Sequence, residues 1–195
     1  MISMTEAETG SGHRRRIIAA AVEQTARSGW STVTMARLAE SAGVSRQTVY
    51  NEIGSKQALA EAMVHDELGR FLSVVERAFD RSPADLEASI RGAVRAVLEL
   101  ARDNVLLRAI VSATHDADTD LLPLLTTNAG SLLATAKGVL AHRLAAFDLP
   151  LDDHQVAATI DVVVRAVLSH VMQPSGTPES TAADITWIVG RVLAV

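Results

Sequence analysis

Side chains that hydrogen-bond to base edges or to phosphate are concentrated in one short stretch of the chain, residues 45–51, which reads SRQTVYN. Arginine can bind guanine, and glutamine can bind adenine, through two hydrogen bonds each. Hydroxyl groups suit phosphates or base edges, and a lysine at the start of a helix suits a phosphate. The residues that we predict to contact DNA on these grounds are Thr34, Ser45, Arg46, Gln47, Thr48, Tyr50, Asn51 and Lys56.

Two short helices, expected over 34–41 and 46–51, have to position these side chains. The turn between them contains Gly43, which can adopt a backbone angle closed to most residues and lets the second helix turn back across the first. Ser45 is a good N-cap for the second helix. Apolar contacts from Leu38, Ala39 and Val49 hold the pair together. This arrangement is a helix-turn-helix, whose second helix enters the major groove of DNA.

The remainder of the chain is predicted to be helical throughout, because apolar residues recur at helical spacing and no strand alternation is found. Residues 1–12 show no periodicity and are expected to form a disordered arm. Ser82 and Pro83 are predicted to open a helix, and Asp152 is predicted to cap another. We therefore expect an all-α fold of about nine helices, with a three-helix DNA-binding domain over 13–57 and a helical effector-binding and dimerisation domain over 58–195. The expected helices span 13–28, 34–41, 46–51, 56–80, 82–102, 104–114, 123–147, 153–172 and 178–195.

Composition excludes several classes of protein. The 195 residues contain no cysteine, which excludes disulfides, thiolate metal sites and cysteine nucleophiles. We find no signal-peptide pattern and no uninterrupted apolar run of membrane-spanning length, so a cytoplasmic protein with no membrane partner is expected. The net charge of −5 is unevenly spread, since residues 13–60 carry seven basic and three acidic groups. A small basic module on an acidic body is typical of a nucleic-acid-binding protein.

No residue pattern indicates catalysis or a cofactor. The aspartates at 116, 118 and 120 resemble the start of a calcium loop, but the glycine and the final acid that such a loop needs are missing. The six histidines show no metal-ligand spacing. Because serine-centred elbows, phosphate-binding glycine loops and zinc helices are also absent, we expect no enzyme activity, no metal and no cofactor.

Residues 15–60 resemble the DNA-binding domain of the TetR (tetracycline repressor) family. Two positions depart from the family pattern: Glu52 replaces an aromatic residue or histidine, and Thr25 stands where a bulky apolar residue is common. The matching residues are Arg16-Ile17-Ile18, Ala20-Ala21, Gly29, Thr34, Leu38-Ala39, Ala42-Gly43-Val44-Ser45, Thr48-Val49-Tyr50, Lys56 and Leu59.

The resemblance implies a bacterial homodimeric repressor whose body binds a small effector and dimerises through its last two helices. Those helices carry wide apolar stripes, and the residues expected at the dimer interface are Val156, Ile160, Val163, Val167, Val171, Ile185, Ile188 and Val192. The available pocket lining is aliphatic, so we expect an apolar effector such as an acyl chain. The lining residues expected are Phe71, Val75, Val94, Val97, Leu107, Ile110, Val111, His115, Leu133 and Val164.

Two alternatives remain at this stage. The chain can be a helical protein–protein module that kept the helix-turn-helix but lost DNA binding, an idea motivated by the acid at Glu52, or a helical lipid-binding protein. The basic run Arg14-Arg15-Arg16 can be an arm that reaches phosphates or a minor groove, or a solvated start of a helix.

Overall fold

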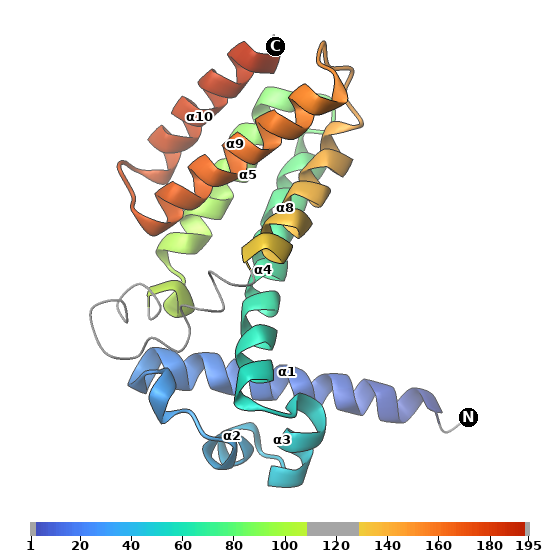
Figure 1. Ribbon diagram of the computed structural model, residues 1–195, viewed down its shortest axis with the longest axis vertical. Coiled ribbons are helices and arrows are strands. Elements are labelled where there is room, and N and C mark those ends of the chain that lie inside the picture. Colours follow the sequence, from blue (N-terminus) through green and yellow to red (C-terminus); the bar gives the residue numbers. More distant parts are fainter. Residues whose placement is uncertain (1–2, 109–128, 194–195) are drawn as a thin grey trace. The chain divides into compact units, whose positions relative to one another are not determined.

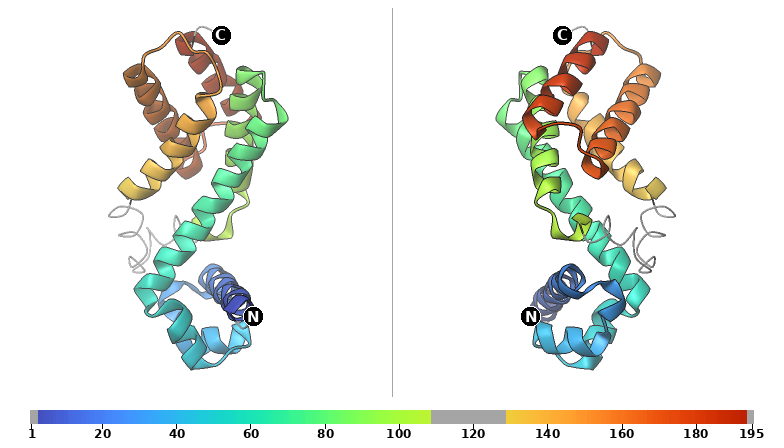
Figure 2. Two further views of the ribbon diagram at one scale, coloured as in Figure 1. Left: turned by 90° about the vertical axis from the view of Figure 1, so that its right-hand side faces the viewer. Right: turned by 90° about the vertical axis from the view of Figure 1, so that its left-hand side faces the viewer.

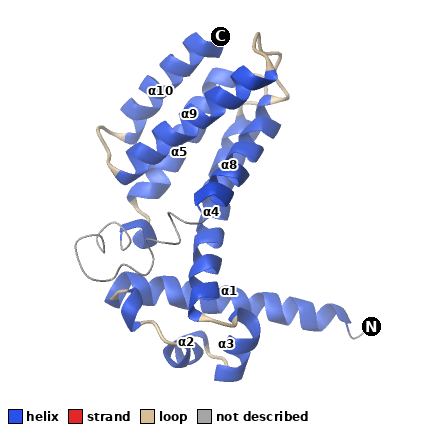
Figure 3. Ribbon diagram, viewed as in Figure 1, coloured by secondary structure: helices blue, strands red, loops and turns tan. Residues whose placement is uncertain are grey.

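The structure, a computed structural model, describes residues 3–108 and 129–193. Every element in these ranges is a helix, as Figure 3 shows, and the predicted all-α class is confirmed. The elements follow one another as α1 (Ser3–Ser28), the 3-10 helix η1 (Trp30–Thr32), α2 (Met35–Ala42), α3 (Arg46–Ile53), α4 (Lys56–Arg81), α5 (Leu86–Arg102), α8 (Ala129–Leu144), α9 (Asp153–Met172) and α10 (Pro178–Leu193) (Figure 1).

The chain divides into two compact units. Among the described residues, the head unit comprises 3–67 with 105–108, and the body unit comprises 68–104 with 129–193. The division falls inside α4, whereas the sequence predicts a domain boundary between residues 57 and 58. The first turns of α4 therefore belong to the head, because Leu59 and Met63 are buried in the head core.

The head unit is held together by α1, which packs across both α2 and α3. Ile17 and Ala21 of α1 are fully buried, as are Leu38 of α2 and Val49 of α3. Full burial of a side chain of this size stabilises a fold by about 1.5–3 kcal/mol. This core fixes α3 on one side and leaves its other side to solvent.

The turn between α2 and α3 has the conformation that the sequence predicts. Gly43 has φ 64° and ψ 41°, which is the left-handed region that glycine enters at little cost. Its N–H donates to the Glu40 carbonyl, and the Val44 N–H donates to the Ala39 carbonyl, so the end of α2 is satisfied. Ser45 then caps α3, and its Oγ accepts the Thr48 N–H at 3.0 Å.

The body unit is a stack of helices in which α10 packs most closely on α5, while α9 contacts α5, α8 and α10 (Figure 2). Val94 and Leu98 of α5 share a buried core with Ile160 of α9 and with Ile185 and Val189 of α10. Around this core, polar contacts join the elements at the surface.

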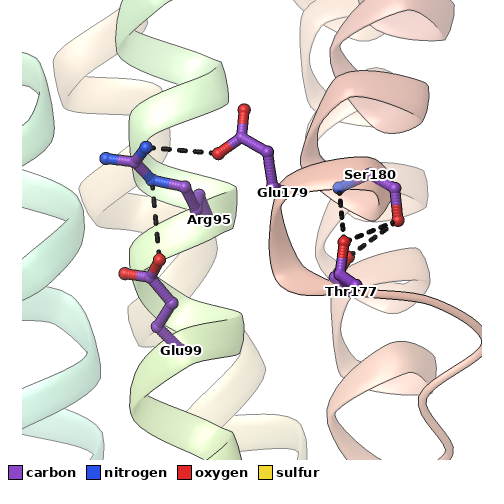
Figure 4. A network of polar contacts seen from close by, with 5 residues as sticks. All are labelled: Arg95, Glu99, Thr177, Glu179 and Ser180. Carbon is purple, nitrogen blue, oxygen red and sulfur yellow. Dashed lines mark hydrogen bonds and ion pairs between the residues drawn. The ribbon is translucent and has the colours of Figure 1, made fainter.

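An ion pair ties α5 to the start of α10. Arg95 contacts Glu179 at 3.2 Å and Glu99 at 3.8 Å, as Figure 4 shows. Beside this pair, the Thr177 Oγ1 accepts the Ser180 N–H at 3.1 Å and caps the first turn of α10. The segment before α10 thus ends in a well-defined helix start that Thr177 caps.

Two helix starts differ from the prediction. The first helix begins at Ser3, so residues 3–12 are helical and not a disordered arm. The fifth helix begins at Leu86 with Asp85 as its N-cap, not at Ser82. The Asp85 N–H donates to the Ser82 carbonyl at 3.1 Å, which makes residues 82–85 a turn, and the Asp85 carboxylate accepts the Ala88 N–H at 2.9 Å.

α9 is the one helix within the described ranges that is long and apolar enough to cross a membrane by length and composition. Only 11% of the most apolar 18-residue stretch of α9 is buried. Asp152 caps it in a reciprocal box: the Asp152 carboxylate accepts the Gln155 N–H at 2.8 Å and the Gln155 side chain accepts the Asp152 N–H at 3.0 Å. The sequence predicts this cap correctly.

Candidate nucleic-acid interface

The outward side of α3 carries the side chains that the sequence predicts to read DNA. Arg46, Gln47 and Asn51 are exposed, and the Tyr50 ring is 53% exposed although it is a large apolar group. Val49 and Ile53, on the opposite side of α3, are buried. The helix is therefore amphipathic, with its polar face free to enter a groove.

Hydrogen bonds within the head order part of this face. The Gln47 Nε2 donates to the Asn51 Oδ1 at 2.8 Å, one helical turn away. The Ser45 and Thr48 hydroxyls lie 2.9 Å apart. Arg46 makes no side-chain hydrogen bond or ion pair with any residue that the structure describes. A free guanidinium beside a pre-ordered amide pair is suited to contact base edges.

Thr34 has a structural role in addition to any contact with DNA. Its Oγ1 accepts the Arg37 N–H at 3.3 Å and caps α2. Its side chain is exposed, and its hydroxyl hydrogen is not used by that cap. Thr34 can therefore cap α2 and donate to a phosphate at the same time.

Lys56 is anchored at the N-terminus of α4. Its Nζ donates to the Ser31 carbonyl at 3.4 Å and lies 4.8 Å from the centroid of the Trp30 ring. Ser55 caps the same helix by accepting the Ala58 N–H at 3.1 Å. The anchoring holds a positive charge beside the positive end of a helix, which favours an anion.

Arg14 binds the C-terminal end of α3. Its Nη1 donates to the main-chain carbonyl of Glu52 in the last turn of α3, where a helix favours positive charge. The sequence analysis offers Arg14 as part of an arm that reaches DNA. It does not predict the hydrogen bond from Arg14 to the Glu52 carbonyl. The structure thus gives Arg14 a role in holding α3 against α1.

The two departures from the family pattern have different consequences. Thr25 is 2% exposed, and its hydroxyl donates to the Ala21 carbonyl at 2.7 Å, so the polar group is satisfied inside the core. The side chain of Glu52 is half-buried in the last turn of α3. Its position at the end of α3 separates it from Arg46 and Gln47 in the first turn.

The residues predicted to line an effector pocket lie mostly in the core of the body. Val75, Val94 and Val164 are buried there, Val97 and Leu133 pack against them, and Phe71 is half-buried. Leu107 belongs to the head unit instead. The predicted residues Ile110, Val111 and His115 lie outside the described ranges.

A small cavity of about 70 Å³ lies between the end of α5, the end of α9 and the start of α10. It is bordered by Leu98, Arg102, His170 and Thr181, and by none of the predicted pocket residues. Its volume corresponds to a few water molecules at most, which is far below that of a typical ligand pocket.

The apolar stripe predicted for dimerisation lies mainly on the inward side of α9 and α10. Ile160 and Ile185 are 4% and 6% exposed and pack in the core of the body, and Val156, Val163, Val167 and Val171 pack against that core. Ile188 and Val192, the other two predicted residues, are exposed. The exposed apolar residues that the sequence analysis missed on these two helices are Val162, Leu168, Met172 and Trp187.

A charged cluster joins α8 to α9. Asp161 contacts Arg165 at 2.8 Å and Lys137 at 3.0 Å. Hydrogen bonds from Arg165 and then Lys137 lower the pKa of the Asp161 carboxyl, and the same contact raises the pKa of Arg165. Across residues 3–108 and 129–193, no group of three acidic or histidine side chains is arranged to hold a metal ion.

Models of two domains match the chain. Residues 17–63 match the bacterial regulatory proteins of the tetR family, and residues 85–191 match the bacterial tetracyclin repressor C-terminal domain. Together these matches cover the second part of α1, all of α2 and α3, the start of α4, and most of the body. Both halves of the predicted architecture thus belong to one family.

Similar proteins agree with these models. The HTH-type transcriptional regulator AlkX of Mycobacterium tuberculosis is 30% identical over 168 residues, which cover 82% of this chain and 75% of that protein. The crystal structure of the TetR family repressor AlkX from a Dietzia strain, implicated in biodegradation of n-alkanes, has a TM-score of 0.71 at 28% identity and covers 93% of this chain and 95% of its own.

A more distant structure shares the fold. The fatty acid degradation regulator FadR of Bacillus halodurans has a TM-score of 0.58 at 18% identity, over 90% of this chain and 96% of its own. The helix-turn-helix geometry, the two domain matches and the AlkX relatives lead to one conclusion: the chain belongs to the TetR family of bacterial transcriptional regulators.

Proposed function

We propose that this regulator is a cytoplasmic homodimeric repressor that binds operator DNA through α3 and leaves it when a small aliphatic molecule binds the body. The observation that carries the DNA part is the outward face of α3. There, Arg46 and Tyr50 are exposed while Val49, between them, is fully buried. The contact residues we propose are those predicted from the sequence, from Thr34 to Lys56.

A dimer is proposed because α9 and α10 expose large apolar side chains. Trp187 is 64% exposed and Val162 is 66% exposed, on helices that contact each other. Large exposed apolar side chains on neighbouring helices support an interaction site there. A twofold dimer also matches how helix-turn-helix proteins read two half-sites spaced by a helical turn.

The aliphatic effector is proposed from the composition of the body. The chain contains three phenylalanines, two tryptophans and one tyrosine, so few rings are available to stack on a planar ligand. A relative at 28% identity is a repressor implicated in biodegradation of n-alkanes, and this supports an apolar, unbranched ligand for the present chain. An effector of this class needs no metal and no cofactor.

Selection of fragments from the source genome, followed by titration at several salt concentrations, tests the DNA part. We expect log affinity for a selected fragment to fall steeply as log salt rises, because phosphate contacts release counterions. Weak binding with no sequence preference at any salt would instead favour a helical module that has lost DNA binding.

Thermal shift with dodecanoic acid and with 2-naphthoic acid tests the effector class. A ligand at 100 times its Kd stabilises the folded state by about 2.7 kcal/mol, which is readily measured. We expect dodecanoic acid to raise the Tm and to release the selected DNA. A shift with the planar acid alone would refute the aliphatic assignment without affecting the DNA part.

A further inference from the structure

The outward face of α10 carries two charges placed symmetrically about two apolar residues. Asp184, Trp187, Ile188 and Arg191 are all exposed, and Trp187 and Ile188 are 64% and 54% exposed. Asp184 and Arg191 are seven residues apart, so they lie about 10.5 Å apart along the helix and on the same side of it. The midpoint between them is the midpoint between Trp187 and Ile188.

Neither charge finds an opposite charge among the residues that the structure describes. Asp184 has no hydrogen bond or ion pair with any described residue. The Arg191 guanidinium lies 5.9 Å from the centroid of the Trp187 ring and pairs with no carboxylate in the described ranges. By contrast, Asp161 and Arg165 on the exposed side of α9 pair with each other.

We propose that α10 packs against α10 of a second copy of this chain in an antiparallel register that pairs Asp184 with Arg191 of the partner subunit. This proposal rests on the dimer proposed above and adds its register. A twofold axis perpendicular to α10 at the midpoint exchanges residues at equal distances on either side. It therefore creates two identical ion pairs. Because Trp187 and Ile188 lie on opposite lateral sides of this face, it places Trp187 beside Trp187 of the partner subunit and Ile188 beside Ile188 of the partner subunit.

We infer that a second copy of this chain covers the outward face of α10, because the charges on that face are complementary to those of an identical face. A twofold interface brings the same patch of both subunits together, so that a contact from one residue to another is always repeated in reverse. An acid and a base at equal distances from the axis satisfy this requirement, whereas two acids would repel. The stacking of Arg191 on Trp187 holds the guanidinium on the outward face.

The same geometry lets the pair of Asp184 and Arg191 influence which chains dimerise with each other. Charge pairs at an interface act mainly through the penalty they impose on like-charge contacts. A related regulator with a base at the position of Asp184, or with an acid at the position of Arg191, would meet Arg191 or Asp184 of this chain with a charge of the same sign. The two residues therefore select identical chains from similar ones.

Charge reversal tests the register in the full-length protein. D184R and R191D each place two like-charge contacts in a homodimer, and we expect each to weaken homodimerisation by roughly 100-fold, measured by sedimentation. An equimolar mixture of D184R and R191D should form heterodimers with an affinity near that of the unchanged protein. The double variant D184R/R191D should recover the homodimer.

Control variants separate the register from the dimer itself. D148R and R77D reverse exposed charges elsewhere and should leave the dimer unchanged, while W187E should break it whatever the register. Helix content by circular dichroism checks that each variant folds. If W187E is monomeric while D184R and R191D dimerise normally, the register is wrong and the dimer stands. If the unchanged protein is monomeric, both proposals fail.

Discussion

Replacement of Lys56 by alanine tests the proposed phosphate contact at the start of α4. A dimer contains two such lysines, and each phosphate contact contributes about 0.9 to the slope of log affinity against log salt on duplex DNA. If each ammonium neutralises one phosphate, K56A lowers the magnitude of the slope by about 1.8. Between 50 and 200 mM salt, the affinity ratio of the parent protein to K56A should then fall by roughly 12-fold.

Fluorescence anisotropy with a labelled operator fragment measures both slopes. K56R keeps the charge and should keep the slope. K137A is the matched control, because Lys137 is in the body unit and pairs with Asp161. K56A also removes the contact with the Trp30 ring, worth about 0.5–1 kcal/mol at an exposed site, so its unfolding should be measured alongside. An unchanged slope with an altered sequence preference would refute the assignment of Lys56 to phosphate.

Three further predictions address the recognition helix, the turn before it and the body. R46A should cost about 1–3 kcal/mol of operator binding and relax the preference at one base position, as a panel of single-base operator variants would reveal; equal losses on every operator would contradict base reading. G43A should lower the free energy of unfolding, measured in urea, by about 1–2 kcal/mol, because Gly43 has a positive φ. G69A is the control. Gly69 is helical and has open space around it, so G69A should raise the free energy of unfolding by about 0.5–1 kcal/mol. The lowered pKa of Asp161 means that its contacts stabilise the fold fully above the carboxyl's ordinary pKa of 3.8 and are lost as the pH falls through the lower, folded value. D161N should therefore flatten the loss of stability with acid, and an identical acid profile for D161N and the parent would show that the contacts contribute nothing.

Local signals in the sequence are sufficient for the turn between α2 and α3 and for the helix caps. Gly43, Ser45 and Asp152 each act within four residues of themselves, through a positive φ or a capping hydrogen bond, and the structure has each as predicted. The apolar positions of α3 also follow directly from helical spacing, because one face of that helix is polar. Prediction succeeds where the interaction and its signal lie in the same short segment.

Which side of α9 faces the core could not be predicted in the same way. Its valines occupy almost every side of the helix, so periodicity does not distinguish the inward face, with Ile160 and Val164, from the outward face, with Val162 and Leu168. Only the packing of α5, α8 and α10 against α9 decides which valines are buried. This is why six of the eight predicted dimer residues lie on the inward side.

Contacts between distant segments were also beyond the sequence. Arg14 and Glu52 are 38 residues apart, and Lys56 reaches Ser31 across 25 residues. Neither contact has a local pattern, since an arginine at a helix surface and a lysine at a helix start are common in any chain. The start of α5 was also ambiguous in the sequence, because Ser82 and Asp85 are both residue types that cap helices well. In the structure, the Asp85 N–H donates to the Ser82 carbonyl in a turn, and Asp85 is the N-cap.

In the proposed complex, α3 of each subunit lies in a major groove of the operator. Methylation of guanine N7 by dimethyl sulfate measures this most directly, because N7 is exposed in the major groove. We expect protected guanines in two half-sites that lie one helical turn, or a multiple of it, apart. R46A should lose protection at the same guanine position in both half-sites. Tight binding that leaves every guanine N7 reactive, or a single protected site, would contradict this placement of α3.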